Sequence, residues 1–151
     1  MDDLIRAKKR ALYLLTDMDR TEKELYDKLK KTGYPESVIT ETMDYVRGFG
    51  YLDDRKYAKR YIGTYCDRKS KARLRFDMQK KGLSKEIISE AFEIAGNYDE
   101  RELIRKLAEK KAKTLDMADP KNISRVASYL SRQGFSSSDI MSVIGQDFHC
   151  C

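Results

Sequence analysis

Apolar residues recur along the chain at fixed distances from three glycines. Gly33, Gly82 and Gly134 stand 49 and 52 residues apart. Around each glycine, apolar residues occupy the positions eight and four residues before it and one, six and ten residues after it. These residues are Leu25, Leu29, Tyr34, Ile39 and Met43; Leu74, Met78, Leu83, Ile88 and Phe92; and Val126, Leu130, Phe135, Ile140 and Ile144. A pattern shared at five offsets in three copies predicts an internal repeat of about 50 residues.

The first helix of each repeat is predicted from an apolar stripe. Spacings of three and four residues are typical of a helix that buries one face. The stripes are Leu4, Ala7, Ala11 and Leu15; then Tyr57, Ala58, Tyr61, Ile62 and Tyr65; then Leu103, Ile104, Leu107, Ala108, Ala112 and Leu115. The tyrosines of the second stripe fit core positions better than a platform on which bases would stack.

The other two helices of each repeat are bounded by capping signals. Thr21 with Glu24 matches the capping box, in which a hydroxyl and a carboxylate each accept a hydrogen bond from a backbone amide. The repeat glycine ends the second helix, because glycine adopts the left-handed C-cap without steric cost. Pro35 suits the opening turn of a third helix, and Asp119–Pro120 is an N-cap followed by a first-turn proline. We predict an all-α protein of about nine helices, arranged as tandem three-helix repeats in a short curved solenoid.

The glycine-centred pattern also predicts the division of the chain. The three repeats are expected at 1–52, 53–97 and 98–147, with a tail at 148–151. A unit of about 50 residues buries too little surface to be secure alone, so each repeat should dock on its neighbour. Such an array suits an extended partner better than a small molecule.

Positive charge is concentrated in the second repeat. The chain has 31 Lys and Arg against 25 Asp and Glu, and between Arg55 and Lys85 twelve bases are offset only by Asp67 and Asp77. Concentrated like charge is relieved by a polyanion or an acidic partner, and its spacing does not choose between nucleic acid and an acidic protein surface. The candidate binding residues are Arg55, Lys56, Lys59, Arg60, Arg68, Lys69, Lys71, Arg73, Arg75, Lys80 and Lys81.

The residues that usually carry catalysis or bind metals are scarce. His149 is the one histidine, and it stands beside Cys150–Cys151 at the chain end without the separated ligand pairs of a zinc site. Cys66 follows an apolar stripe and is expected to be a half-buried structural thiol, and Asp53–Asp54 is explained by capping at a helix start. We therefore predict a protein that is not an enzyme and needs neither metal nor cofactor.

The sequence also indicates the compartment. No stretch approaches the roughly 20 apolar residues of a membrane-spanning helix. The first residues lack the basic flank and apolar run of a secretory signal. Three cysteines, two of them adjacent, make no disulfide framework, so a cytoplasmic protein without a membrane partner is expected.

Several motifs, in this order, resemble the RecX regulatory proteins. The run Thr21-x-x-Glu24-Leu25-x-x-Lys28-Leu29 followed by Gly33-Tyr34 resembles the first repeat of that family. The run Gly50-Tyr51-Leu52-Asp53-Asp54-x-x-Tyr57-Ala58-x-x-Tyr61 resembles its most recognisable motif. The runs from Arg73-Leu74 to Lys81-Gly82-Leu83 and Tyr129-Leu130-x-Arg132-x-Gly134-Phe135 fit the second and third repeats. The resemblance extends from about residue 5 to residue 145.

The resemblance implies a bacterial cytoplasmic regulator of recombination, DNA repair and the SOS response. Members of the family bind the filament of RecA recombinase on single-stranded DNA and suppress its recombinase and ATPase activities. A monomer lying along the filament groove is expected. The family pattern does not assign the bases of the second repeat individually, so that candidate site depends on charge alone.

An alternative is a helix-turn-helix-like regulator that binds duplex DNA. A recognition helix should carry base-reading Asn, Gln or Arg in its first turns. The third helices instead begin with Pro35-Glu36-Ser37, Lys85-Glu86-Ile87 and Ser137-Ser138-Asp139, which are poor readers of bases.

Overall fold

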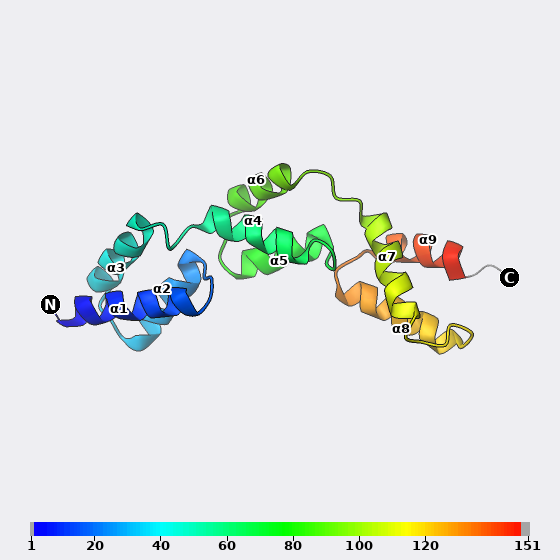
Figure 1. Ribbon diagram of the computed structural model, residues 1–151, viewed down its shortest axis with the longest axis horizontal. Coiled ribbons are helices and arrows are strands. Elements are labelled where there is room, and N and C mark those ends of the chain that lie inside the picture. Colours follow the sequence, from blue (N-terminus) through cyan, green and yellow to red (C-terminus); the bar gives the residue numbers. More distant parts are fainter. Residues whose placement is uncertain (1, 149–151) are drawn as a thin grey trace. The chain divides into compact units, whose positions relative to one another are not determined.

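The computed structural model describes residues 2–148, and over these residues the chain forms nine α-helices and no strand (Figure 1). The all-α prediction of tandem three-helix repeats is confirmed. The His149-Cys150-Cys151 tail lies outside the described residues. The helices are α1 (Asp2–Asp17), α2 (Glu22–Thr32), α3 (Glu36–Gly48), α4 (Asp54–Tyr65), α5 (Lys71–Lys80), α6 (Lys85–Ala95), α7 (Glu100–Ala112), α8 (Pro120–Arg132) and α9 (Ser137–Phe148). No helix in residues 2–148 combines the length and apolarity needed to cross a bilayer.

The three repeat glycines follow the middle helices α2, α5 and α8 with nearly the same backbone. Their φ angles are 101° for Gly33, 94° for Gly82 and 95° for Gly134, all in the left-handed region. After α5, the Leu83 amide donates to the Met78 carbonyl at 3.1 Å, which satisfies a carbonyl that the helix end leaves without a partner. The predicted left-handed glycine is therefore confirmed at the end of all three middle helices, and at α8 it follows the C-cap residue Gln133.

The predicted helix starts are mostly confirmed. Thr21 Oγ1 accepts from the Glu24 amide at 3.1 Å, and the Glu24 carboxylate accepts from the Thr21 amide at 3.0 Å, which completes the capping box. Asp119 accepts from the Lys121 amide at 2.9 Å, and proline follows it at the first position of α8. Pro35 lies one position earlier than predicted, since its extended backbone (ψ 152°) makes it the N-cap residue of α3.

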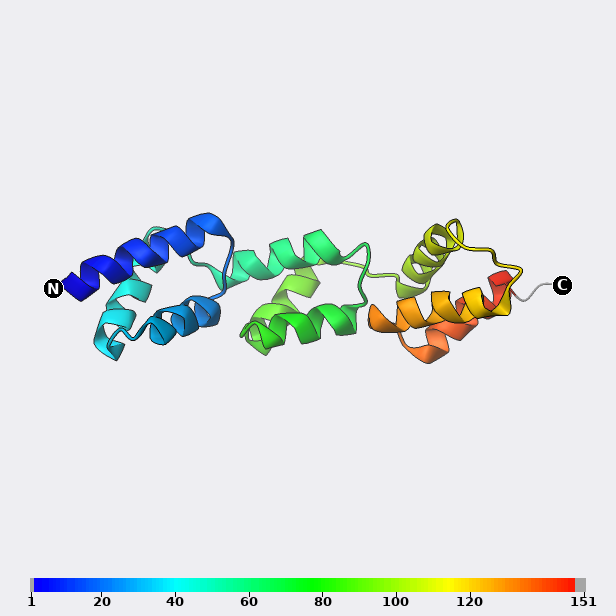
Figure 2. The ribbon, with the colours of Figure 1, turned by 90° about the horizontal axis from the view of Figure 1, so that it is seen from below.

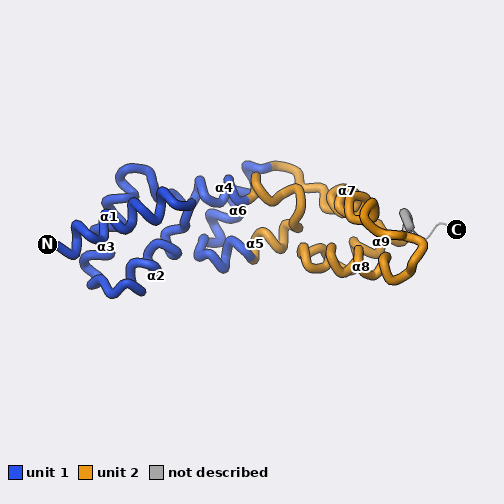
Figure 3. The backbone as a smooth tube through the Cα atoms, turned by 60° about the horizontal axis from the view of Figure 1, so that its bottom comes forward, with its two compact units in different colours: residues 1–61, 77–95 blue, residues 62–76, 96–151 orange. Residues whose placement is uncertain are grey.

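The chain forms two compact units, and the division falls within α4 and α5 (Figure 3). The first unit takes in the chain up to Tyr61 and Asp77–Ala95, and the second takes in Ile62–Phe76 and the chain from Gly96 onward. In the first unit α1 packs on α2 and α3, and in the second α7 packs on α8 and α9 (Figures 1 and 2). Each unit has its own apolar core.

The core of the first unit corrects the predicted stripe of α1. Ala7 and Ala11 are buried as expected, but Leu14 rather than Leu15 completes the buried face. The spacing of four and then three residues keeps Leu14 on the same side of the helix, whereas Leu15 lies about 100° further round. Leu15 packs at the edge of this core.

A joint between successive middle helices occurs in each unit. In the first unit the hydroxyl of Thr21 donates to the Lys81 carbonyl at 2.6 Å. In the second unit the amide of Ser70 donates to the Gln133 carbonyl at 3.0 Å. Thr21 and Ser70 both stand at a helix start twelve residues before a repeat glycine and are fully buried. In both units, neighbouring repeats are thus joined through the backbone carbonyl of the residue that precedes the repeat glycine.

The glycine of the following repeat lets this joint close. A Cβ atom on Gly82 would overlap the side chain of Lys23, and one on Gly134 would overlap the Ser70 hydroxyl. At Gly33, by contrast, a Cβ would meet nothing within 4 Å. The glycines at 82 and 134 therefore serve both as helix caps and as contact points between repeats.

Candidate binding surface

Four of the predicted binding residues form one exposed face on the first part of α4. Arg55, Lys56, Lys59 and Arg60 are all exposed, whereas Ala58 between them is fully buried. At 100° per residue they cover an arc of about 140° on the side away from Ala58. We refer to these four residues as the α4 face.

Carboxylates from α6 and from the loop after α1 partly neutralise the α4 face. Arg55 forms an ion pair with Glu90 of α6, and Arg60 Nη1 lies 2.9 Å from a carboxylate oxygen of Asp19. Both acids are distant in the sequence, so the count of local charges missed them. Among the described residues, the ammonium groups of Lys56 and Lys59 have no such partner. These two lysines are the cations of the α4 face most available to a ligand.

Lys81 has a structural role at the end of α5. Its ammonium lies 3.6 Å from the Glu24 carboxylate and 5.9 Å from the centre of the Tyr61 ring. Burial lowers the pKa of Lys81, but the Glu24 carboxylate and the Tyr57 hydroxyl outweigh this, and the pKa is raised above its ordinary 10.5. Lys81 is half-buried, whereas the preceding Lys80 is exposed.

Five further predicted residues belong to the second unit. Arg68, Lys71 and Arg73 are exposed, whereas Lys69 and Arg75 are half-buried. Lys71 and Arg75 share one side of α5, and Arg73 points about 200° away from Lys71, so the three do not form a single face. The eleven predicted residues therefore divide into six in the first unit and five in the second.

The turn that follows α4 is held in place by Tyr98. The Tyr98 hydroxyl donates a hydrogen bond to the Lys69 carbonyl. Burial raises the pKa of this phenol, and the neighbouring Cys66, Glu100 and Asp67 raise it further. Lys69 and Arg68 lie over the Tyr65 ring, with the Lys69 ammonium 4.4 Å from the ring centre. The basic turn is thus positioned by aromatic contacts on two sides.

The tyrosines of the second stripe only partly match their predicted core role. Ala58 and Ile62 are buried, but Tyr57, Tyr61 and Tyr65 are half-buried. Tyr57 and Tyr61 stack with ring centres 6.2 Å apart. Burial raises the pKa of Tyr57 above its usual value. The Tyr61 ring lies beside the Lys81 ammonium and the Tyr65 ring beside Arg68 and Lys69, so these half-buried rings contact cations and do not fill a core.

The residues considered for chemistry have structural roles where they are described. Asp53 accepts from the amides of Arg55 and Lys56, and Asp54 accepts from the Glu22 amide at 2.9 Å, so the acid pair caps helices as predicted. Cys66 is half-buried, as expected. Among the side chains that the structure describes, residues 2–145, no group of three His, Cys, Asp or Glu is placed to hold a metal ion.

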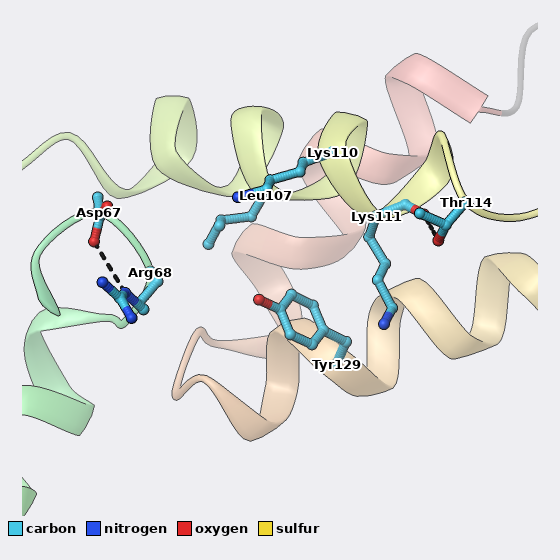
Figure 4. Close-up of a pocket in the computed structure, with 7 residues that line it drawn as sticks. All are labelled: Asp67, Arg68, Leu107, Lys110, Lys111, Thr114 and Tyr129. Carbon is cyan, nitrogen blue, oxygen red and sulfur yellow. Dashed lines mark hydrogen bonds and ion pairs between the residues drawn. The ribbon is translucent and has the colours of Figure 1, made fainter.

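Sequence reasoning missed a polar cleft in the second unit (Figure 4). The cleft has a volume of about 470 Å³ and lies between α7, α8 and the turn after α4. Its polar lining comprises Asp67, Arg68, Lys110, Lys111, Thr114 and Tyr129. The Lys111 ammonium lies 5.1 Å from the centre of the Tyr129 ring. The adjacent lysines at the end of α7 indicate positive charge there in the sequence, but the cleft exists only because α7 packs against α8.

The fold defines a protein built from three-helix units in tandem. Models of the first, second and third three-helix domains of RecX match residues 7–45, 53–91 and 99–144, respectively. The chain therefore belongs to the RecX family.

Individual relatives agree with this assignment. The chain is 26% identical over 148 residues to the regulatory protein RecX of Clostridium tetani, with 96% of this chain and 68% of the relative covered. It is 35% identical over 151 residues to the regulatory protein RecX of Bacillus licheniformis, but spans only 56% of that protein. The crystal structure of RecX from Lactobacillus salivarius matches with a TM-score of 0.74 at 26% identity, over 96% of both chains.

Proposed function

We propose that this protein regulates the RecA recombinase by binding RecA filaments on single-stranded DNA and lowering their recombinase and ATPase activities. The observation that carries the proposal is the match to all three RecX domains in their order along the chain. The protein acts as a cytoplasmic monomer and catalyses no reaction of its own.

The mechanism we infer is bridging of filament protomers. Tandem repeats offer several surfaces to a partner that itself repeats, and each surface is too small to hold it alone. A regulator changes an equilibrium only through its different affinity for the two states. Tighter binding to one filament conformation would therefore impede the rearrangement that accompanies ATP turnover.

The predicted bases supply the attraction to the filament. Eight of the eleven are exposed, including the whole α4 face. Lys and Arg contribute to nucleic-acid affinity by displacing counterions from the phosphates. We propose that these bases contact DNA or acidic RecA surface.

ATP hydrolysis by the cognate RecA on single-stranded DNA tests the proposal. Addition of the protein in equal amount to RecA should lower the rate of hydrolysis and of strand exchange. Unchanged rates would overturn the proposed function.

A charge variant then locates the contact. Replacing Arg68, Lys69, Lys71, Arg73 and Arg75 by Gln should weaken both filament binding and inhibition. The control replaces Arg6, Lys9, Arg10, Lys28 and Lys31 of the first repeat, which are all exposed, and so removes the same charge. Equal effects of the two variants would argue against a role for the predicted segment.

Binding to duplex DNA of different sequences tests the helix-turn-helix alternative. A tight preference for one duplex operator would favour that alternative.

A further inference from the structure

A second hollow adjoins the cleft between α7 and α8. It has a volume of about 450 Å³ and is lined by Lys111, Leu115, Ser124, Arg125, Ser128 and Arg132. Lys111 lines both hollows, so the two are neighbours along the same pair of helices. We call the two hollows together the α7–α8 strip.

The α7–α8 strip is strongly cationic. Its lining includes Arg68, Lys110, Lys111, Arg125 and Arg132. Among the described residues that line it, Asp67 is the only acid, and Asp67 lies 3.2 Å from Arg68 Nε. Arg125 Nη1 donates to the neutral Asn122 side chain at 3.2 Å. Four of the five cations thus face the strip without a lining carboxylate to neutralise them.

The neutral polar side chains of the strip carry hydroxyl groups, which can donate hydrogen bonds, and Leu107 and Leu115 complete the lining. Ser124 and Ser128 are exposed on α8, and Tyr129 is half-buried beside them. Figure 4 shows the Tyr129 hydroxyl directed towards the turn that carries Arg68. Within the described part of the chain this hydroxyl has no hydrogen-bond partner. It is therefore available to donate to a bound anion.

The composition of the strip favours a phosphate backbone over a protein partner. Arg and Tyr are common at both kinds of interface, whereas Lys and Ser are depleted at protein–protein interfaces, so the lysines and serines of the strip decide the comparison. Lys, Arg, Ser, Thr and Tyr are the side chains that contact phosphate and sugar oxygens. The strip offers these types along two successive hollows, as a chain of repeating phosphates requires.

We propose that the α7–α8 strip binds the sugar–phosphate backbone of a nucleic-acid strand. Lys111 contacts the phosphate between the two hollows, Arg125 and Arg132 contact a phosphate on the second hollow, and Tyr129 donates a hydrogen bond to an oxygen in the first. This assigns DNA binding to the third repeat in addition to the basic second repeat. The inference rests on the proposed function, since the strand it would hold is the DNA of the filament.

The test measures binding of the full chain to DNA without RecA. The probe is a labelled oligo-dT of about 30 nucleotides, and the readout is the slope of log affinity against log salt concentration. The variant carries Lys111→Gln, Arg125→Gln and Arg132→Gln. Because each neutralised single-strand phosphate contributes about 0.7 to the slope and the three residues contact two phosphates, the variant should lower its magnitude by about 1.4.

A matched control removes the same charge elsewhere. Lys9→Gln, Lys28→Gln and Lys31→Gln change three exposed lysines of the first repeat. This variant should keep the wild-type slope. Equal slopes for the two variants would overturn the inference, as would an absence of oligo-dT binding by the wild type at low salt.

Three additional measurements separate the alternatives. If the strip variant loses RecA inhibition but keeps its slope on DNA, the strip contacts protein and the inference is wrong. Lys111→Gln alone, which keeps both arginines, should lower the slope by about 0.7. It replaces the triple variant if circular dichroism shows that the triple variant is unfolded. A duplex probe should give about 0.9 per contact if the strip accepts both forms of DNA. Failure of the RecA assay with this slope change intact would refute the proposed function alone.

Discussion

The hydroxyl of Thr21 donates a hydrogen bond to the Lys81 carbonyl at 2.6 Å while accepting one from the Glu24 amide at 3.1 Å. One buried oxygen thus caps α2 and ties it to the end of α5, 60 residues away in the sequence. Ser70 occupies the same position in the second unit, where its hydroxyl accepts from the Arg73 amide at 2.9 Å.

Thr21→Val removes both hydrogen bonds and keeps the shape of the side chain. We expect a loss of about 2 kcal/mol in the free energy of unfolding, since a cap is lost and the Lys81 carbonyl is left without this donor. Urea unfolding followed by circular dichroism measures the change. Thr40→Val is the control, because the Thr40 hydroxyl donates only to the Glu36 carbonyl on an exposed surface. A loss no greater than that of Thr40→Val would show that the joint contributes little.

Gly134→Ala should destabilise the second unit. The Gly134 φ of 95° costs an alanine about 1–2 kcal/mol, and its Cβ would lie 2.5 Å from Arg73 Cβ. Gly63→Ala is the contrasting variant, because Gly63 lies inside α4 with nothing within 4 Å of an added Cβ. Helix propensity predicts that Gly63→Ala stabilises the protein by up to about 1 kcal/mol. Thermal unfolding midpoints that move in the same direction for both variants would contradict this account.

Asp54 should make stability depend on pH in the acidic range. Burial raises its pKa above the usual 3.8, although the hydrogen bond from the Glu22 amide lowers it. A raised pKa means that the folded state binds the proton more tightly, so stability falls as pH rises through the range just above 3.8. Asp54→Asn keeps an acceptor oxygen but does not titrate.

The stability of Asp54→Asn relative to wild type should therefore increase from about pH 3 to about pH 7. Thermal unfolding across this range measures the trend. An NMR titration of the Asp54 carboxyl provides a direct check, and a midpoint below 3.8 would contradict the assignment.

The cations of the α4 face should differ in their contribution to DNA binding. Lys56→Gln with Lys59→Gln should lower the salt slope on oligo-dT by about 1.4, corresponding to two phosphate contacts. Arg55→Gln with Arg60→Gln removes the same charge but should lower it less, since Glu90 and Asp19 already occupy those guanidinium groups. Equal slopes would show that the ion pairs open when DNA binds.

The helices and their ends could be predicted because their signals are local. The capping box of Thr21 and Glu24 spans four residues, and each repeat glycine acts on the helix turn that precedes it. Apolar spacing identified the buried positions before each glycine, including Leu25, Leu74 and Val126, which are fully buried. Leu14 was missed because two adjacent leucines satisfy the same spacing almost equally well.

The surface could be predicted only in part because charge pairing is tertiary. The sequence shows few acids after Arg55, but not that Glu90 of α6 and Asp19 of the loop after α1 pair with Arg55 and Arg60. The α7–α8 strip was missed for the same reason. Lys111 and Arg125 lie on different helices and meet around one hollow only through packing.

Both joints between middle helices use a backbone carbonyl oxygen, which every residue possesses. A hydroxyl or amide at a helix start and a glycine in the facing turn are enough to form the joint, whatever side chains the repeat carries on its surface. The three repeats can therefore differ in charge, as the basic second repeat and the mixed first and third repeats do, without losing their attachment to one another.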